Sequence, residues 1–208
     1  MGFARYFSKV RWVLSILGIV LIYIFFRMIF SGSDAPMYQN PFILILIHLG
    51  YYSILFPFDY SNTMMVYRQE YLEKYYRKAL GQIIRIGIGY MVPLHVLIYI
   101  AGYLLRDWMD WQKMGVALLY NSCNAVLFGS VYLVASNRWN TLVAKVGLYS
   151  ILPFCYGINF GGEFFEAVNF LYFAREAMFH TGLFLRSIGC YGVLFALIYA
   201  LRKKKERT

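Results

Sequence analysis

Two histidines, His48 and His95, lie within long apolar stretches of the sequence. An imidazole at such a position can relay protons or contact a polar substrate, because it changes charge near neutral pH. A neutral ring can also form hydrogen bonds between neighbouring helices and so hold a bundle together. We favour this structural role over a proton relay, and the sequence leaves both open.

The three cysteines, Cys123, Cys155 and Cys190, also fall within apolar stretches, far apart in the sequence. None has a second type of metal ligand at a useful spacing, so the sequence predicts neither a zinc site nor a disulfide framework. A membrane cysteine peptidase would need a cysteine beside a histidine in a hydrated site. No motif spacing supports such a pair.

The motifs of nucleotide hydrolysis and of metalloproteases do not occur in the sequence. There is no G-x-x-x-x-G-K loop followed by serine or threonine, and the glycine-rich stretch 81–89 lacks the lysine and hydroxyl that hold phosphate and magnesium. H-E-x-x-H is also absent. We therefore predict that this chain has no catalytic residue, no metal and no cofactor of its own.

The composition indicates which elements position these side chains. Of the 208 residues, 61% are hydrophobic and 14% are charged, whereas a soluble domain has about 45–50% apolar and about 25% charged residues. A helix needs about 20 apolar residues to cross a bilayer. The sequence thus predicts an all-α, polytopic membrane protein, a single six-transmembrane-helix bundle over residues 1–208. Its expected spans are 13–30, 41–57, 82–105, 114–135, 142–160 and 182–201.

The basic residues predict that both termini lie in the cytoplasm. With that orientation, 15 of the 20 lysines and arginines lie in or beside the N-terminus, the second-to-third loop, the fourth-to-fifth loop and the C-terminal tail. Short cytoplasmic loops are enriched in these residues. Topology and contact with membrane lipids then explain the net charge of +10, and nucleic acid is not an expected partner.

Residues 61–80 are expected to form an amphipathic helix on the cytoplasmic surface between the second and third spans. The stretch has neither proline nor glycine, and Ser61 or Asn62 can cap it. An ordinary basic loop, anchored at the interface by its tyrosines, is the alternative. The candidate contact residues of this segment are Tyr67, Arg68, Glu70, Tyr71, Lys74, Tyr75 and Arg77.

Residues 161–181 are too polar to form a span, because charged residues interrupt their aromatic ones. We expect either short re-entrant or interfacial helices, or an interfacial loop with an aromatic belt. The carboxylates of this segment are Glu163, Glu166 and Glu176.

The order of these elements resembles an ABC-2-type transporter permease. Two spans, a cytoplasmic helix rich in tyrosine and arginine, two spans, a short basic turn, a fifth span, a semi-polar external segment and a last span follow one another. The likeness covers nearly the whole chain in topology and loop character. It is closest to the small bacterial permeases encoded beside bacteriocin or lantibiotic immunity ATPases, although many members of the family are longer and have a larger external domain.

This resemblance implies a function and partners. The 61–80 helix would be the coupling helix that docks on an ATP-binding subunit, and the three carboxylates of 161–181 would form an external gate. The chain would lie in the bacterial cell membrane with a second permease copy or a different permease subunit. Two separate ATP-binding subunits would carry ATP and magnesium.

The expected cargo of such an exporter is hydrophobic or amphipathic, a peptide above all, as in immunity to antimicrobial peptides. Two other functions stay open from the sequence. The chain could be a small-solute-binding membrane subunit of an importer, or an intramembrane peptidase or lipid-modifying enzyme.

Overall fold

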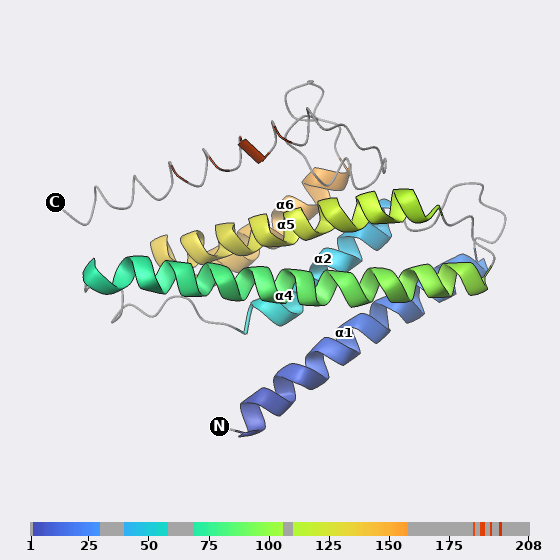
Figure 1. Ribbon diagram of the computed structural model, residues 1–208, viewed down its shortest axis with the longest axis horizontal. Coiled ribbons are helices and arrows are strands. Elements are labelled where there is room, and N and C mark those ends of the chain that lie inside the picture. The colour runs from blue at the N-terminus through green and yellow to red at the C-terminus, as the bar shows by residue number, and fades with distance from the viewer. Residues whose placement is uncertain are drawn as a thin grey trace.

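The computed structural model describes residues 2–29, 40–57, 69–105 and 110–157, together with the single residues 185, 188, 189, 192 and 196. Every regular element in this part of the chain is an α-helix, as the sequence predicts. Figure 1 shows the helices lying side by side in a bundle. They are α1 (Gly2–Ile29), α2 (Pro41–Leu55), α4 (Gln69–Leu104), α5 (Trp111–Arg138) and α6 (Thr141–Gly157).

Short polar side chains fix where three of these helices begin. The Asn40 side chain accepts a hydrogen bond from the Phe42 amide at 2.9 Å, and Pro41 occupies the first turn of α2. Asp110 accepts from the Gln112 amide at 2.9 Å at the start of α5, and Asn140 accepts from the Val143 amide at 3.2 Å before α6. Each cap satisfies an amide that the helix itself leaves without a partner.

Three helices are long and apolar enough to cross a membrane: Val10–Ile29, Arg77–Leu104 and Trp111–Ser136. They correspond to the first, third and fourth predicted spans. The second predicted span, 41–57, is the shorter apolar helix Phe42–Leu55, and the fifth, 142–160, is α6 with 17 residues. The sixth predicted span, 182–201, lies outside the described residues except for five isolated positions that are helical.

The helix α4 differs from the sequence-based prediction at its N-terminal half. We expected a separate surface helix over 61–80, followed by a span that begins at residue 82. Instead α4 continues for 36 residues through both Gly81 and Pro93. The physical reason lies on either side of Gly81, where Ala79 and Ile83 are both buried in the core and keep the helix against the bundle.

The helix α2 lies at the centre of the bundle, in contact with α1, α4, α5 and α6. Small residues let its neighbours come close. A Cβ added at Gly50 would meet the hydroxyl of Tyr90 and lie 2.8 Å from the Ser15 Oγ. One added at Gly129 would lie 2.7 Å from the Tyr51 hydroxyl. Glycine at these positions therefore permits close helix packing of the kind found in membrane proteins.

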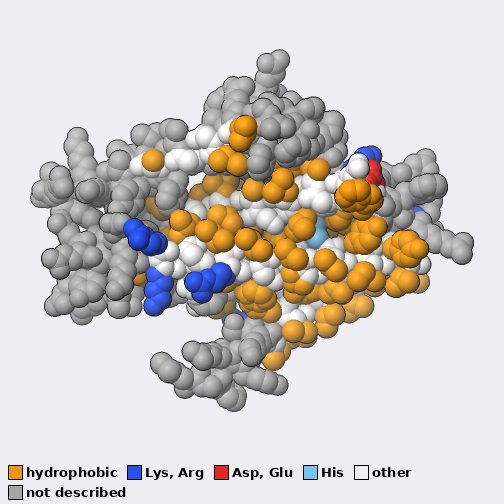
Figure 2. All heavy atoms as spheres, in the orientation of Figure 1, with side chains coloured by type: hydrophobic (Ala, Val, Ile, Leu, Met, Phe, Trp, Pro, Cys, Tyr) orange, Lys and Arg blue, Asp and Glu red, His pale blue; other side chains and the backbone are white. Residues whose placement is uncertain are grey.

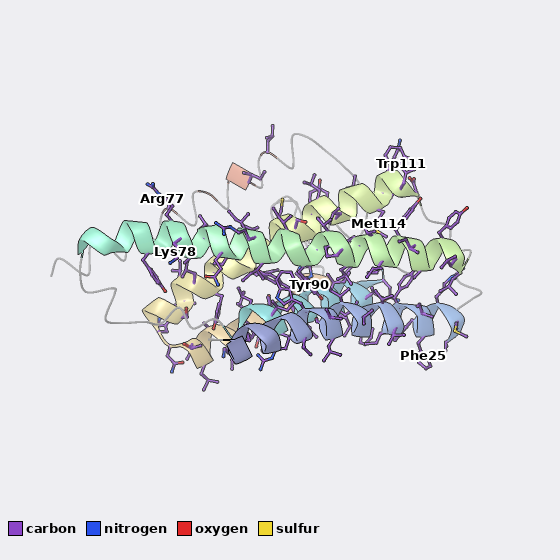
Figure 3. The ribbon with its side chains drawn as sticks, turned by 60° about the horizontal axis from the view of Figure 1, so that its bottom comes forward. Phe25, Arg77, Lys78, Tyr90, Trp111 and Met114 are labelled. Atoms are coloured by element: carbon purple, nitrogen blue, oxygen red, sulfur yellow. The ribbon has the colours of Figure 1, made fainter. Side chains whose placement is uncertain are left out.

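The side chains that face away from the bundle are large and apolar. On α1, Leu14, Leu21 and Phe25 are more than 60% exposed, whereas Ile19 and Tyr23 are buried. Figure 3 shows Phe25 pointing away from the other helices, and Tyr90 lying between α4 and the neighbouring helices. An exposed apolar surface of this kind fits a lipid environment, in which such residues need no burial in protein.

Candidate functional site

Polar side chains are buried where α4 faces α5. His95 on α4 donates from Nδ1 to the Met91 carbonyl at 2.8 Å. Its Nε2 accepts a hydrogen bond from the Asn121 amide nitrogen on α5 at 3.0 Å. The first bond leaves Nε2 without a proton and so makes it an acceptor for Asn121. His95 thus forms the hydrogen bond between helices that we expect of a structural imidazole.

Two asparagines on α5 have further hydrogen-bonding capacity. Asn121 and Asn124 are at most 1% exposed and stand three residues apart, so they share one face of the helix. Among the described residues, no partner is present for the Oδ1 atom of Asn121 or the Nδ2 atom of Asn124. This face of α5 therefore offers one acceptor and one donor inside the bundle, enough to hold a water molecule or a polar group.

His48 is fully buried on α2, on the side that faces α5. Its Nδ1 lies 3.0 Å from the Leu44 carbonyl, and its ring meets the Phe128 ring edge-on at 5.8 Å. Phe128 also packs edge-on against Tyr52. These contacts embed His48 in an aromatic cluster and support a packing role for it.

The aromatic cluster continues to α6. The Phe56 ring stacks on Tyr52 at 5.0 Å and meets Tyr149 edge-on at 5.1 Å. Lys145 places its ammonium 5.7 Å from the centre of the Phe56 ring, within the range of a cation–π contact. Aromatic packing therefore links α2 with α5 and α6.

The geometry disfavours a peptidase that pairs His95 with Cys123. Asn121 faces His95, and a side chain two residues further along an α-helix points about 200° away. Cys123 accordingly lies on the other side of α5, where it lines a groove. Nor does the described part of the chain contain any group of three or more residues that could hold a metal ion.

The segment expected to couple to an ATP-binding subunit is only partly described. Tyr67 and Arg68 precede the first residue of α4 and lie outside the described residues, while Glu70, Tyr71 and Lys74 belong to α4. Tyr75 is half-buried and packs against the core of its own bundle, so it contributes to folding. Arg77 is exposed near the N-terminal end of α4, next to an exposed Lys78 (Figure 3).

The proposed external gate residues, Glu163, Glu166 and Glu176, lie outside the described residues.

The sequence analysis did not single out Asn121 and Asn124 as candidate site residues. A signal for them existed, since two amides three residues apart within the apolar stretch 114–135 predict one polar face on that helix.

Removal of Asn121 or His95 tests whether their hydrogen bond stabilises the bundle. We expect Asn121→Ala, His95→Ala and the double variant to show a coupling free energy of about 0.6 kcal/mol and at most about 1.7 kcal/mol, as other buried bonds between membrane helices do. The measurement is the free energy of unfolding in mixed micelles. The same cycle with Ser150→Ala on the exposed face of α6 in place of His95→Ala should be additive, because the Ser150 hydroxyl bonds the Val146 carbonyl of its own helix. An additive result for His95 too would contradict the assignment.

Comparison with protein-family models, curated proteins and solved structures finds no match for this chain.

Proposed function

We propose that this chain is the membrane-spanning permease subunit of an ABC-type exporter, driven by separate ATP-binding subunits. In this proposal two such subunits bind ATP and magnesium, and a second permease copy or a different permease subunit completes the transport path. The cargo is hydrophobic or amphipathic, with a peptide as the leading candidate. The observation that carries the proposal is the unbroken length of α4.

The helix α4 is longer than a bilayer is thick. Its 36 residues rise by about 1.5 Å each, which gives about 54 Å, whereas the hydrocarbon core of a bilayer measures about 30 Å. The apolar stretch of the helix begins at Arg77. Residues 69–76 therefore extend beyond the apolar stretch as a continuation of the same helix, and in this proposal the ATP-binding subunit docks on them.

In this proposal, residues 69–76 of α4 transmit a movement of the ATP-binding subunit to the bundle. α4 contacts α1, α2 and α5, so a displacement of its outer end tilts or shifts the part of the helix that carries Tyr90 and His95. An ATP-binding subunit that closes on ATP could therefore move several helices through one lever. This differs from a hinged surface helix, which would have to pass the movement across a flexible joint.

The orientation of the chain belongs to the same proposal. Arg77, Lys78 and Arg85 are exposed at the N-terminal part of α4, and Lys145 lies on α6. Basic residues gather on the cytoplasmic side of membrane proteins. This end of the bundle, and with it the extension of α4, would then face the cytoplasm, where ATP-binding subunits act.

Purification of the tagged chain from its source cells in a mild detergent tests the proposal. We expect an ATP-binding subunit in stoichiometric amount and hydrolysis of Mg-ATP by the purified complex. Lys74→Glu, on the extension of α4, should lower the recovery of that subunit, because it reverses a charge at the interface. Lys113→Glu is the matched control, since Lys113 is exposed at the first turn of α5.

Three results would contradict the proposal: a chain that retains no ATP-binding subunit, ATP hydrolysis that is absent from the complex, or equal recovery in both charge-reversal variants. A tightly bound small solute in place of the ATP-binding subunit would instead favour a solute-capture function.

A further inference from the structure

A groove runs between α4 and α5 on the outside of the bundle. Its volume is about 540 Å³, which is within the range of ligand-binding pockets, about 300–1,000 Å³. Leu80, Ile84 and Ile88 of α4 form one wall, and α5 supplies mostly apolar side chains to the other. Ile188, one of the isolated described residues, borders it as well.

One cation stands in line with the apolar wall of the groove. Arg77 precedes Ile84 by seven residues, which is about 20° short of two full helical turns. It therefore lies on the same stripe of α4 as Leu80, Ile84 and Ile88, just beyond their N-terminal end. The Arg77 side chain is exposed.

Two more cations flank this stripe. Lys78 and Arg85 are also seven residues apart and exposed, so they share a neighbouring stripe about 100° around α4. Figure 2 shows lysine and arginine side chains gathered over the N-terminal part of α4, directly beside hydrophobic ones. A cationic surface thus adjoins the end of an apolar groove.

The position of Arg85 limits what can cover this surface. Arg85 lies eight residues, or about 12 Å, beyond the start of the apolar stretch at Arg77. A charged side chain exposed at that depth is costly unless it extends to the headgroups and meets an anion there. The groove wall from Leu80 to Ile88 also covers about 12 Å, less than the depth of one leaflet, about 15 Å. Both dimensions fit a lipid whose headgroup is near Arg77 and whose chain runs inward.

We propose that this groove is a binding site for an anionic phospholipid of the leaflet at the N-terminal end of α4. One acyl chain occupies the groove, and Arg77 contacts the headgroup phosphate, with Lys78 and Arg85 beside it. The charge of the site selects an anionic lipid over a zwitterionic one. The inference does not depend on the proposed function, because it concerns the isolated chain without an ATP-binding subunit.

Native mass spectrometry of the purified chain in a neutral detergent tests the site. Phosphatidylglycerol and phosphatidylcholine with identical acyl chains are titrated in parallel, and phosphatidylglycerol should bind more tightly. Arg77→Gln should weaken phosphatidylglycerol binding by about fivefold, in keeping with about 1 kcal/mol for one basic residue near an anionic lipid. Lys113→Gln, which removes an exposed cation from the first turn of α5, should change it less than about twofold.

A second pair of variants tests the groove itself. Cys123 is half-buried in its wall, so Cys123→Trp should fill part of the space and weaken binding of both lipids, whereas Cys123→Ser should not. Ser122→Phe, on the same wall, serves if the first variant fails to fold by circular dichroism and size-exclusion chromatography. Equal binding of the two lipids, equal losses in Arg77→Gln and Lys113→Gln, or full binding with a filled groove would each overturn the proposal.

Discussion

Gly50→Ala is expected to destabilise the bundle by about 1–3 kcal/mol, the usual cost of overpacking. The new Cβ would meet the Tyr90 hydroxyl and the ends of Ile19 and Ser15, which come from two different helices. It would also disturb the contact of 3.4 Å between the Ser15 and Tyr90 hydroxyls. The Tyr90, Ile19 and Ser15 side chains would have to shift within the core, or α1 and α4 would have to move away from α2, and this adjustment is the source of the cost.

The measurement is the free energy of unfolding in mixed micelles, followed by helix content. Gly147→Ala is the matched control, because a Cβ there meets nothing within 4 Å. It should be neutral, or stabilising by as much as about 1 kcal/mol, since alanine favours the helical backbone. If both variants behave alike, the close approach of α1 and α4 at Gly50 is not a determinant of stability.

If the chain has the proposed exporter function, Gly81→Pro is expected to abolish most of the ATP-driven activity while the proposed ATP-binding subunit stays attached. A proline inside a helix removes one backbone hydrogen bond and clashes with the preceding turn, at a cost of about 3 kcal/mol. Gly81 lies four residues inside the apolar stretch that begins at Arg77. α4 already contains Pro93, and a second proline at position 81 would weaken the helix between residues 69–76 and the rest of the bundle. The partner would then move an extension that no longer moves the bundle.

Gly81→Ala is the control, because a Cβ at this position meets nothing within 4 Å and alanine reinforces the helix. Both variants are compared by copurification of the ATP-binding subunit and by ATP hydrolysis in liposomes. Loss of the subunit together with activity in Gly81→Pro would indicate a docking defect or misfolding. Full activity in that variant would show that α4 does not act as a lever.

Apart from α4, the positions of the described helices could be predicted closely from the sequence, because long apolar stretches separated by short polar loops leave few alternatives. The spans expected at 13–30 and 114–135 lie within α1, apart from residue 30, and within α5. Boundaries were harder to predict. The expected span began at residue 114, whereas α5 begins at Trp111, because the Asp110 side chain caps the helix there. Hydropathy places Asp110 and Trp111 in a polar loop at the membrane interface and does not detect the cap.

The continuity of α4 could not be predicted from local sequence. Gly81 and the change in polarity around it are typical of a helix boundary, yet a glycine costs a helix only about 1 kcal/mol. Burial of Ala79 and Ile83 on either side outweighs that cost. Only the packing of α4 against the other helices shows which of these effects prevails.

The hydrogen bond between His95 and Asn121 illustrates the same difficulty at the candidate site. Both residues lie in predicted spans, but their pairing depends on how far α4 and α5 are rotated and shifted relative to one another. That register depends on close approaches such as Gly129 of α5 to Ile83 of α4, where an added Cβ would collide with the Ile83 side chain. A hydropathy pattern contains no information on it.

The central position of α2 has a consequence for biogenesis. Three of the four helices that surround it, α4, α5 and α6, follow it along the chain. Because synthesis proceeds from the N-terminus, α2 enters the bilayer before these neighbours exist. Until they arrive, His48 lacks the contact with Phe128 that covers it in the finished bundle. Before α5 packs against it, the His48 ring on this face of α2 is in contact with lipid tails, an unfavourable place for a polar side chain.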